Sequence, residues 1–194
     1  DNEKQEITAE VSVKSNYDYS IAISPDWLTY EDKGRNNDGS RKYVFHADPE
    51  KLYAAGGYGE QTAIVSFAYQ AETRTPATKE YAVKFAGITP SMSCDMDPVV
   101  LDDMMGDGYQ ATIHVVSNIK WALENTPSFS DVTYPVANSS VNFFEVNTSV
   151  KLTYNKAELQ VEEENGTLTF VDAEGKALDY SLNVKYPGVG NDYV

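Results

Sequence analysis

The stretch at residues 11–21, VSVKSNYDYSI, returns about 102 residues later as IHVVSNIKWAL at residues 113–123. Both copies alternate aliphatic residues with others, turn at Ser-Asn, and then place an aromatic and an aliphatic residue two positions apart. The match runs on without a gap to SPDW at residues 24–27 and TPSF at residues 126–129. Two copies of one fold share their turns and their alternating apolar positions, so the sequence predicts a tandem duplication.

Apolar and polar residues alternate in most of the chain, as in TAIVSFAY at residues 62–69. A period of two indicates half-buried strands, and turn residues about every ten positions are typical of a sandwich or barrel. Helix-length periodicity is absent, although residues 48–55 and 157–164 could each hold a short helical turn. We therefore expect an all-β chain of two β-sandwich domains, residues 1–88 and 89–188, with a linker or tail at residues 189–194.

The second copy contains an apolar run, PVVL at residues 98–101, ahead of the position equivalent to Asp1. We expect this run to be the first strand of the second domain. The first copy lacks it, so we favour a first domain that begins upstream of Asp1, and the alternative is a sheet edge left uncovered. An uncovered edge would invite pairing with another chain.

Charge and composition exclude several classes of partner and cofactor. The 194 residues carry 15 Lys and Arg against 30 Asp and Glu, a net charge of −15 that repels nucleic acid. No window of about 18 apolar residues is present, so we expect no direct membrane insertion of this segment. The single cysteine, Cys94, excludes an internal disulfide and a cysteine-rich zinc site. We expect a monomer without a cofactor.

The chain carries little that nucleophilic catalysis could use. Its two histidines, His46 and His114, both lie in strand patterns, and His114 falls on the solvent face between two aliphatic residues. The sequence has no GxSxG, HExxH, GxGxxG or phosphate-binding loop motif. We therefore expect no enzyme, and a hydrolase that uses two unidentified carboxylates is the alternative left open.

The densest acidic segment spans residues 95–108. Calcium prefers six to eight oxygen ligands, which aspartates near a domain boundary could supply in part. The apolar run at residues 99–101 interrupts the DxDxDG spacing, so we favour a solvated linker and no metal. The calcium alternative would use Asp95, Asp97, Asp102 and Asp103.

Aromatic residues divide into a core set and a candidate binding set. Trp27 aligns with Phe129, and Trp121 aligns with Tyr19, which predicts that both tryptophans are buried. The aromatics expected in loops remain as candidates for stacking on a sugar. The strongest segment is LYAAGGYG at residues 52–59, whose two tyrosines would point outward, although a plain strand connection is the other interpretation. The candidate ligand-binding residues are Tyr30, Tyr53, Tyr58 and Tyr134.

The order of these motifs resembles the BACON family, immunoglobulin-like modules that are common in secreted and outer-surface proteins of Bacteroidetes. Trp27-Leu28-Thr29 is similar to the family's tryptophan turn, and AIVSF at residues 63–67 is similar to its late strand. The resemblance implies two tandem immunoglobulin-like β-sandwich domains, secreted or on the outer cell surface, with a lipid anchor upstream of Asp1.

The family's name suggests carbohydrate binding, but its members also look like spacers. We therefore expect a non-catalytic cell-surface protein that acts in cell adhesion or in recognition of a glycan or host surface protein. The alternative is an architectural spacer or stalk that positions a further domain lying downstream.

Overall fold

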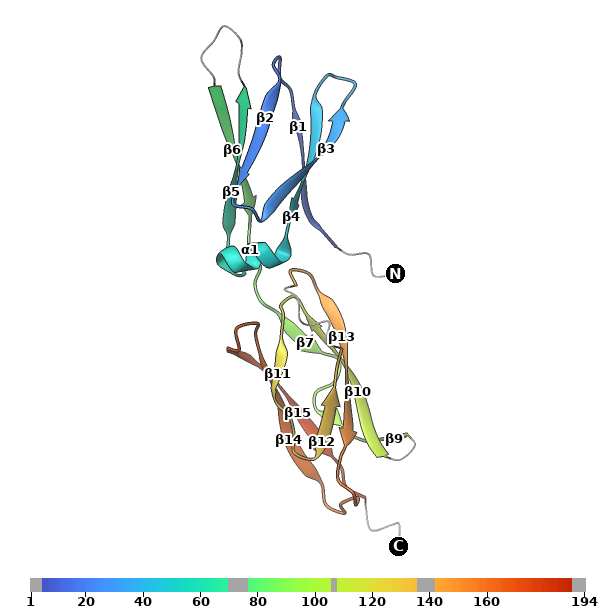
Figure 1. Cartoon of the computed structure of the whole chain (residues 1–194). Coiled ribbons are helices and arrows are strands. Elements are labelled where there is room, and N and C mark those ends of the chain that lie inside the picture. The colour runs from blue at the N-terminus through green and yellow to red at the C-terminus, as the bar shows by residue number, and fades with distance from the viewer. Residues whose placement is uncertain (1–4, 70–76, 106–107, 136–141, 190–194) are drawn as a thin grey trace. The chain divides into compact units, whose positions relative to one another are not determined.

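In the computed structural model the chain is nearly all-β, as the alternation predicts, and the described residues contain one short helix. The structure describes residues 5–69, 77–105, 108–135 and 142–189. The chain divides into two compact units, residues 1–89 (unit 1) and residues 90–194 (unit 2) (Figure 1). Most of the predicted tail, residues 190–194, lies outside the described residues.

Unit 1 consists of two three-stranded antiparallel sheets that enclose an apolar core. Inward-facing side chains from both sheets are buried, among them Phe45 from one sheet and Val65 from the other. One sheet has the order β1–β4–β3, and the other β2–β5–β6. The strands are β1 (Ile7–Val13), β2 (Tyr19–Ser24), β3 (Leu28–Arg35), β4 (Arg41–Ala47), β5 (Gln61–Tyr69) and β6 (Ala77–Phe85).

The helix α1 (Pro49–Gly56) follows β4. The Asp48 carboxylate accepts hydrogen bonds from the backbone N–H groups of Glu50 and Lys51, and Pro49 begins the first turn, so the local sequence starts a helix. Leu52 is fully buried and anchors α1 to unit 1. The helical turn allowed at residues 48–55 is thus a short helix, whereas the described residues 157–164 hold none.

Unit 2 repeats this arrangement with two additional strands in one sheet and one in the other. The path of one sheet is β12–β13–β10–β7, with β9 also paired to β10, and the other is β11–β14–β15–β8. The strand predicted within residues 98–101 is confirmed as β8, which pairs parallel to β15, but it is not the first strand of unit 2, because β7 precedes it. The strands are β7 (Met92–Cys94), β8 (Val99–Val100), β9 (Asp103–Met105), β10 (Gly108–Ser117), β11 (Ala122–Asn125), β12 (Ser130–Thr133), β13 (Val146–Tyr154), β14 (Glu164–Val171) and β15 (Ala177–Tyr186).

Residues paired by the internal repeat occupy equivalent places in the two units. Trp27, Phe129 and Trp121 are all almost completely buried, which confirms their prediction as core residues. The matched turn glycines, Gly87 and Gly188, share a left-handed backbone with φ of 80° and 79°. A side chain on either glycine would collide with a backbone carbonyl of the preceding loop. The repeat therefore preserves a glycine where no larger residue fits.

Candidate functional site

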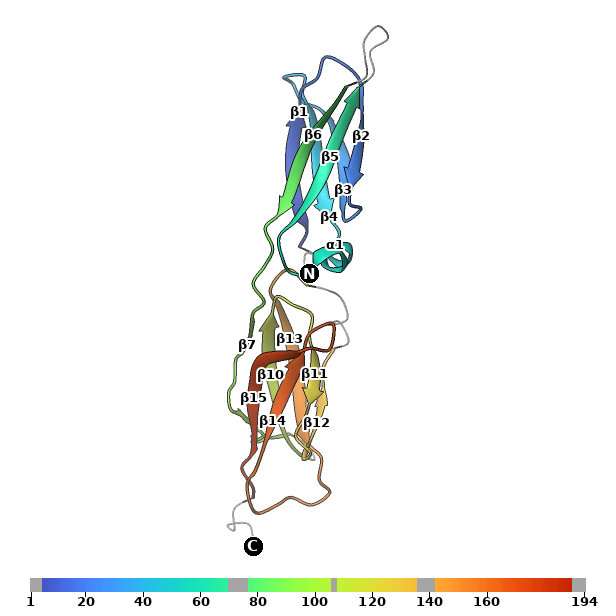
Figure 2. The same cartoon turned by 90° about the vertical axis from the view of Figure 1, so that its left-hand side faces the viewer.

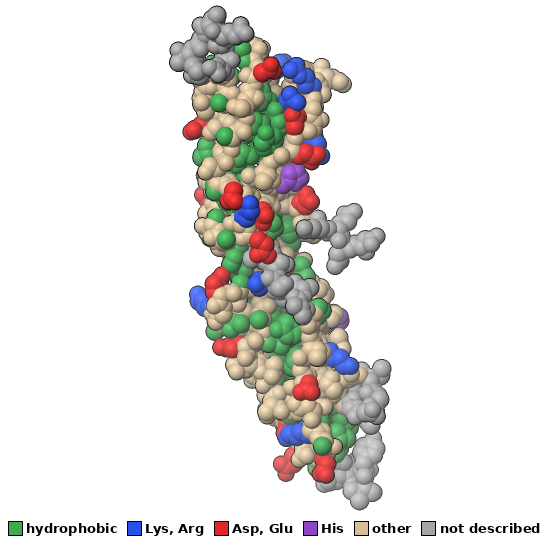
Figure 3. Space-filling model, viewed as in Figure 1, with side chains coloured by type: hydrophobic (Ala, Val, Ile, Leu, Met, Phe, Trp, Pro, Cys, Tyr) green, Lys and Arg blue, Asp and Glu red, His purple; other side chains and the backbone are tan. Residues whose placement is uncertain are grey.

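A shallow depression of about 60 Å³ lies on unit 1 where the loop between β1 and β2 meets the ends of β3 and β4. Figure 3 shows Lys and Arg side chains gathered at the end of unit 1 that carries the turn from β3 into β4. The lining of the depression is mainly polar and includes both tyrosines and arginines. The lining residues are Val13, Ser15, Tyr17, Asp18, Tyr19, Arg35, Gly39, Arg41 and Tyr43.

Two tyrosines contact each other through their hydroxyl groups in this depression. The hydroxyls of Tyr19 and Tyr43 lie 2.8 Å apart, and the Tyr43 ring is almost completely buried. Burial, and then the hydrogen bond with Tyr19, raise the pKa of Tyr43 above its ordinary value of 10.0. The Tyr43 hydroxyl therefore stays neutral at physiological pH, and either hydroxyl of the pair can be the donor.

The two arginines are cross-strand partners, with Arg35 on β3 opposite Arg41 on β4. Arg41 Nε lies 2.7 Å from Asp32 Oδ2, and the hydrogen bond that it donates lowers the pKa of that carboxyl below 3.8. Asp32 thus holds Arg41 in place. The Arg35 side chain is exposed and forms no ion pair with the residues that the structure describes.

Tyr17 presents an aromatic face at the edge of the depression. Its ring stacks on Tyr69 with centroids 5.2 Å apart and an angle of 12° between the planes, and 45% of the residue is exposed. Ser15 accepts a hydrogen bond from the Tyr17 backbone N–H and fixes the loop. One face of the ring is therefore held by a neighbour, while much of the residue remains open to solvent.

The four tyrosines predicted as loop candidates lie elsewhere. The prediction that Tyr53 and Tyr58 point outward from a loop is wrong: Tyr53 lies on α1, both residues are half-buried, and their ring centroids are 4.8 Å apart. The helix caused this difference, because it turns Tyr53 toward Tyr58.

Tyr30 was also expected in a loop but belongs to β3, where its ring packs edge-on against Tyr43 with centroids 5.7 Å apart. Tyr134 follows β12 and stacks on Trp121 with centroids 5.3 Å apart. Tyr134 is half-buried and supports the core of unit 2. The structure brings none of these tyrosines into the lining of the depression.

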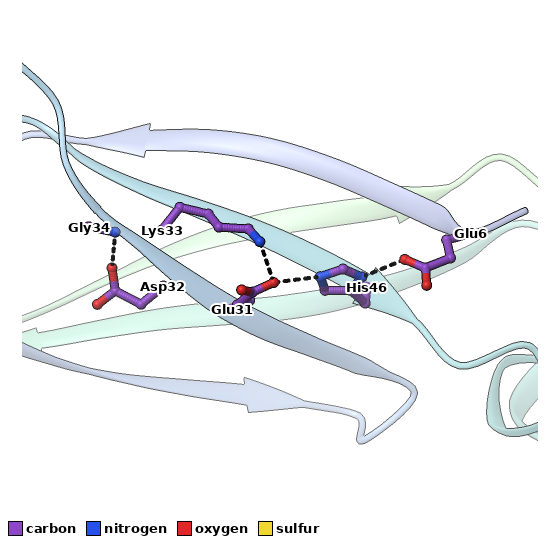
Figure 4. Close-up of polar contacts among 6 residues, drawn as sticks. All are labelled: Glu6, Glu31, Asp32, Lys33, Gly34 and His46. Carbon is purple, nitrogen blue, oxygen red and sulfur yellow. Dashed lines mark hydrogen bonds and ion pairs between the residues drawn. The ribbon is translucent and has the colours of Figure 1, made fainter. Parts of the chain in front are cut away.

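Both histidines lie on the surface of strands, next to carboxylates. Figure 4 shows His46 between Glu6 and Glu31, with His46 Nδ1 3.2 Å from Glu6 Oε2 and Nε2 3.8 Å from Glu31 Oε2. His114 Nδ1 lies 2.8 Å from Asp95 Oδ2, and 46% of its side chain is exposed, so the predicted solvent-facing position is confirmed. The hydrogen bonds observed for the two imidazole rings are to carboxylates, Glu6 for His46 and Asp95 for His114.

The acidic segment is used for backbone contacts in unit 2. Asp95 accepts a hydrogen bond from the His114 backbone N–H, and Asp97 accepts a long one, 3.4 Å, from that of Asn183. Within the described part of the chain, no three His, Cys, Asp or Glu side chains come together as a metal site. Cys94, which lies on β7, is a half-buried free thiol.

Sequence reasoning missed Tyr17, Arg35 and Arg41. One signal could have found the arginines, because NNDG at residues 36–39 is a turn sequence and turns make flanking residues cross-strand neighbours. No local pattern shows that the loop carrying Tyr17 lies beside that hairpin.

No protein-family model matches the chain, and no curated protein matches it. Among solved structures, the chain is similar to protocadherin gamma B2 extracellular cadherin domains 1–5, with 9% identity and a TM-score of 0.32 over 95% of this chain. This chain spans 37% of that protein's length. It is also similar to the sialic acid binding region of the Streptococcus sanguinis SK1 adhesin, with 10% identity and a TM-score of 0.32, covering 94% of this chain and 73% of that one.

Proposed function

We propose that the chain is a non-catalytic recognition protein of the outer cell surface, built from two immunoglobulin-like sandwiches, which binds a glycan at the depression of unit 1. The observation that carries the proposal is that Tyr17, which is 45% exposed, and the exposed Arg35 line the same depression. A carbohydrate ring has an apolar face that stacks on an aromatic ring, and hydroxyl groups that need polar partners around it.

The polar groups around Tyr17 suit the hydroxyl groups of a sugar. A sugar hydroxyl both donates and accepts hydrogen bonds, and this lining offers donors and acceptors within one small area. Arg35 supplies N–H donors, the exposed Asp18 carboxylate accepts, and the hydroxyl of Tyr19 can do either. The net charge of −15 argues against nucleic acid as the ligand.

The size of the depression sets what it can hold. A volume of about 60 Å³ fits a single substituent of a sugar ring, and the rest of the ring would lie over Tyr17. A shallow site of this kind gives weak affinity for one sugar. Many copies of the protein on one surface, binding many copies of the glycan, can strengthen the overall attachment. Such multivalent contact suits adhesion better than capture of a soluble ligand.

The proposed location at the cell surface rests on the resemblance to the BACON family. A lipid anchor upstream of Asp1 is part of this proposal. The helix that the structure describes is too short to cross a membrane.

A glycan array probed with the full chain tests this function, followed by titration of the best ligand. Tyr17→Ala and Arg35→Ala should each weaken binding about tenfold, the effect of losing one stacking or charge-assisted contact. Lys33→Ala is the matched control for charge, because Lys33 lies on the same strand but outside the lining. Tyr53→Ala is the matched control for an aromatic ring.

Binding that falls with Tyr53→Ala but not with Tyr17→Ala would move the site to α1 and overturn the proposal. No binding on the array would also contradict it and would favour the spacer function.

A further inference from the structure

Two arginines lie opposite each other in the lining of the depression. Figure 2, like Figure 1, shows the loop from β1 to β2 and the turn from β3 to β4 at the same end of unit 1, away from α1. Arg35 and Arg41 flank that turn, are direct partners in the antiparallel register and both line the depression. Like charges placed directly opposite each other destabilise a strand pair. An acidic group bound beside the two arginines would relieve this repulsion.

The chain supplies a carboxylate to only one of the two arginines. Asp32 pairs with Arg41, whereas Arg35 has no carboxylate partner among the residues that the structure describes. Acids are not scarce, since the sequence has 30 Asp and Glu against 15 Lys and Arg. Asp38, in the same turn, accepts hydrogen bonds from the backbone N–H and the hydroxyl of Ser40. The N–H donors of Arg35 are therefore left for an acceptor outside the chain.

The tyrosine pair adds a further donor beside the arginines. The hydrogen bond between the hydroxyls of Tyr19 and Tyr43 uses one of their two protons, and the described residues offer no acceptor for the other. Arg41 interacts electrostatically with both hydroxyls, which places them near its guanidinium. Guanidinium and hydroxyl donors together form the surroundings that a carboxylate or a sulfate ester needs.

One acidic residue in the lining, Asp18, limits where an acidic group can bind. Asp18 is exposed and comes from the loop between β1 and β2, whereas both arginines belong to β3 and β4. An acidic group would therefore contact the arginine side of the depression. Asp18 would accept hydrogen bonds from the neutral hydroxyls of the same sugar.

The negative charge of the whole chain does not exclude an acidic sugar. Residues 1–89 hold ten of the 15 Lys and Arg but only 14 of the 30 Asp and Glu, so most of the excess acid lies in unit 2. Exposed charges separated by more than about 8 Å are largely screened at physiological salt. A nucleic acid needs many basic contacts, whereas one acidic sugar needs a single arginine.

We propose that the glycan bound at this depression is acidic, and that the Arg35 guanidinium binds its carboxylate or sulfate ester while the sugar ring lies over Tyr17. This inference rests on the proposed function, because it specifies the class of glycan for the same site. The acidic group is the single substituent that the depression of about 60 Å³ accommodates. A planar guanidinium forms two parallel hydrogen bonds with such a group, which lysine cannot do.

Matched pairs of glycans on one array test the charge of the ligand. One pair is oligogalacturonate and its methyl ester, and the other is a chondroitin sulfate oligosaccharide and its desulfated form. We expect the acidic member of at least one pair to bind the full chain about fivefold more tightly, the effect of an exposed ion pair. The pair that discriminates identifies the group as a carboxylate or a sulfate ester. Raising the salt from about 50 mM to about 500 mM should reduce the difference, because an exposed ion pair is screened.

Three surface variants locate the charge effect. Arg35→Gln should make the acidic glycan bind as weakly as its neutral counterpart. Lys33→Gln removes the same charge from the same strand outside the lining, and should leave the discrimination unchanged. Asp18→Asn should strengthen binding of the acidic glycan about twofold and leave the neutral one unchanged, because it removes a nearby negative charge.

The outcomes separate this inference from the proposed function. Binding of neutral glycans only, or equal binding of both members of each pair, would overturn the inference and leave the proposed function standing. Discrimination that persists in Arg35→Gln would also overturn the inference, because the acidic group would then lie elsewhere. Absence of binding to every glycan would overturn both.

Discussion

The difference between the closed core of unit 2 and the open core of unit 1 predicts unequal effects of two equivalent substitutions. Leu182 and Tyr81 occupy matching positions on the last strands of their units, but Leu182 is 1% exposed and Tyr81 is 49% exposed. Leu182→Ala should therefore destabilise unit 2 by considerably more than Tyr81→Ala destabilises unit 1.

The expected magnitudes follow from burial. Leu182→Ala removes about three carbon groups from a dry core and leaves a cavity, which costs about 3 kcal/mol. Tyr81→Ala loses a half-exposed ring and an edge-on contact with Phe67 at 5.8 Å. This loss costs about 1 kcal/mol, because exposed area contributes nothing. With a urea slope of about 1.5 kcal/mol/M, the midpoints should fall by about 2 M and 0.7 M.

Tryptophan fluorescence can follow the two units separately, because each contains one tryptophan. Trp121→Phe leaves Trp27 to report unit 1, and Trp27→Phe leaves Trp121 to report unit 2. Each substitution is compared with its own single-tryptophan background in urea. Equal shifts of the two midpoints would refute the reasoning, since they would mean that Tyr81 is as well packed as Leu182.

Gly87→Ala should cost unit 1 about 3 kcal/mol, because its φ is 80° and the new Cβ would lie 2.8 Å from the Tyr58 carbonyl oxygen. Gly34→Ala, with a φ of 88° and open space around it, should cost only about 1 kcal/mol in the same urea titration; equal costs would rule out the clash. Asp95→Ala tests pH dependence: hydrogen bonds from His114 hold the pKa of Asp95 below 3.8, so its contribution is present above that pH and is lost as the pH falls below it. Thermal melts of unit 2 between about pH 5 and pH 2 should therefore be flatter in the variant than in the unchanged protein, and parallel curves would contradict this role.

Much of the fold could be predicted from the sequence, because strands with one buried face impose a period of two. Trp27, Trp121 and Phe129 fall on the positions of the alternation that were predicted to face the core, and all three are buried. The strand at residues 92–94 was missed, because a strand of three residues is too short to show alternation. Tyr30 was assigned to a loop because its polar neighbours on β3 resemble turn residues.

The candidate site could not be predicted in the same way. Its residues come from a loop and a hairpin that only the tertiary fold places together. Tyr53 and Tyr58 were attractive because glycines surround them, but a capped helix turns Tyr53 inward. Of these glycines, Gly56 serves packing, because a Cβ there would lie 2.9 Å from the Gln61 side chain.

The parallel pairing of β8 with β15 has a mechanical consequence. It links β8, which follows β7 near the start of unit 2, directly to the last strand β15, so a pull along the two strands loads these hydrogen bonds in shear. The described strands of unit 1 contain no such link, because β1 and β6 lie in different sheets. Under load, unit 2 would act as the stiff element and unit 1 as the one that yields.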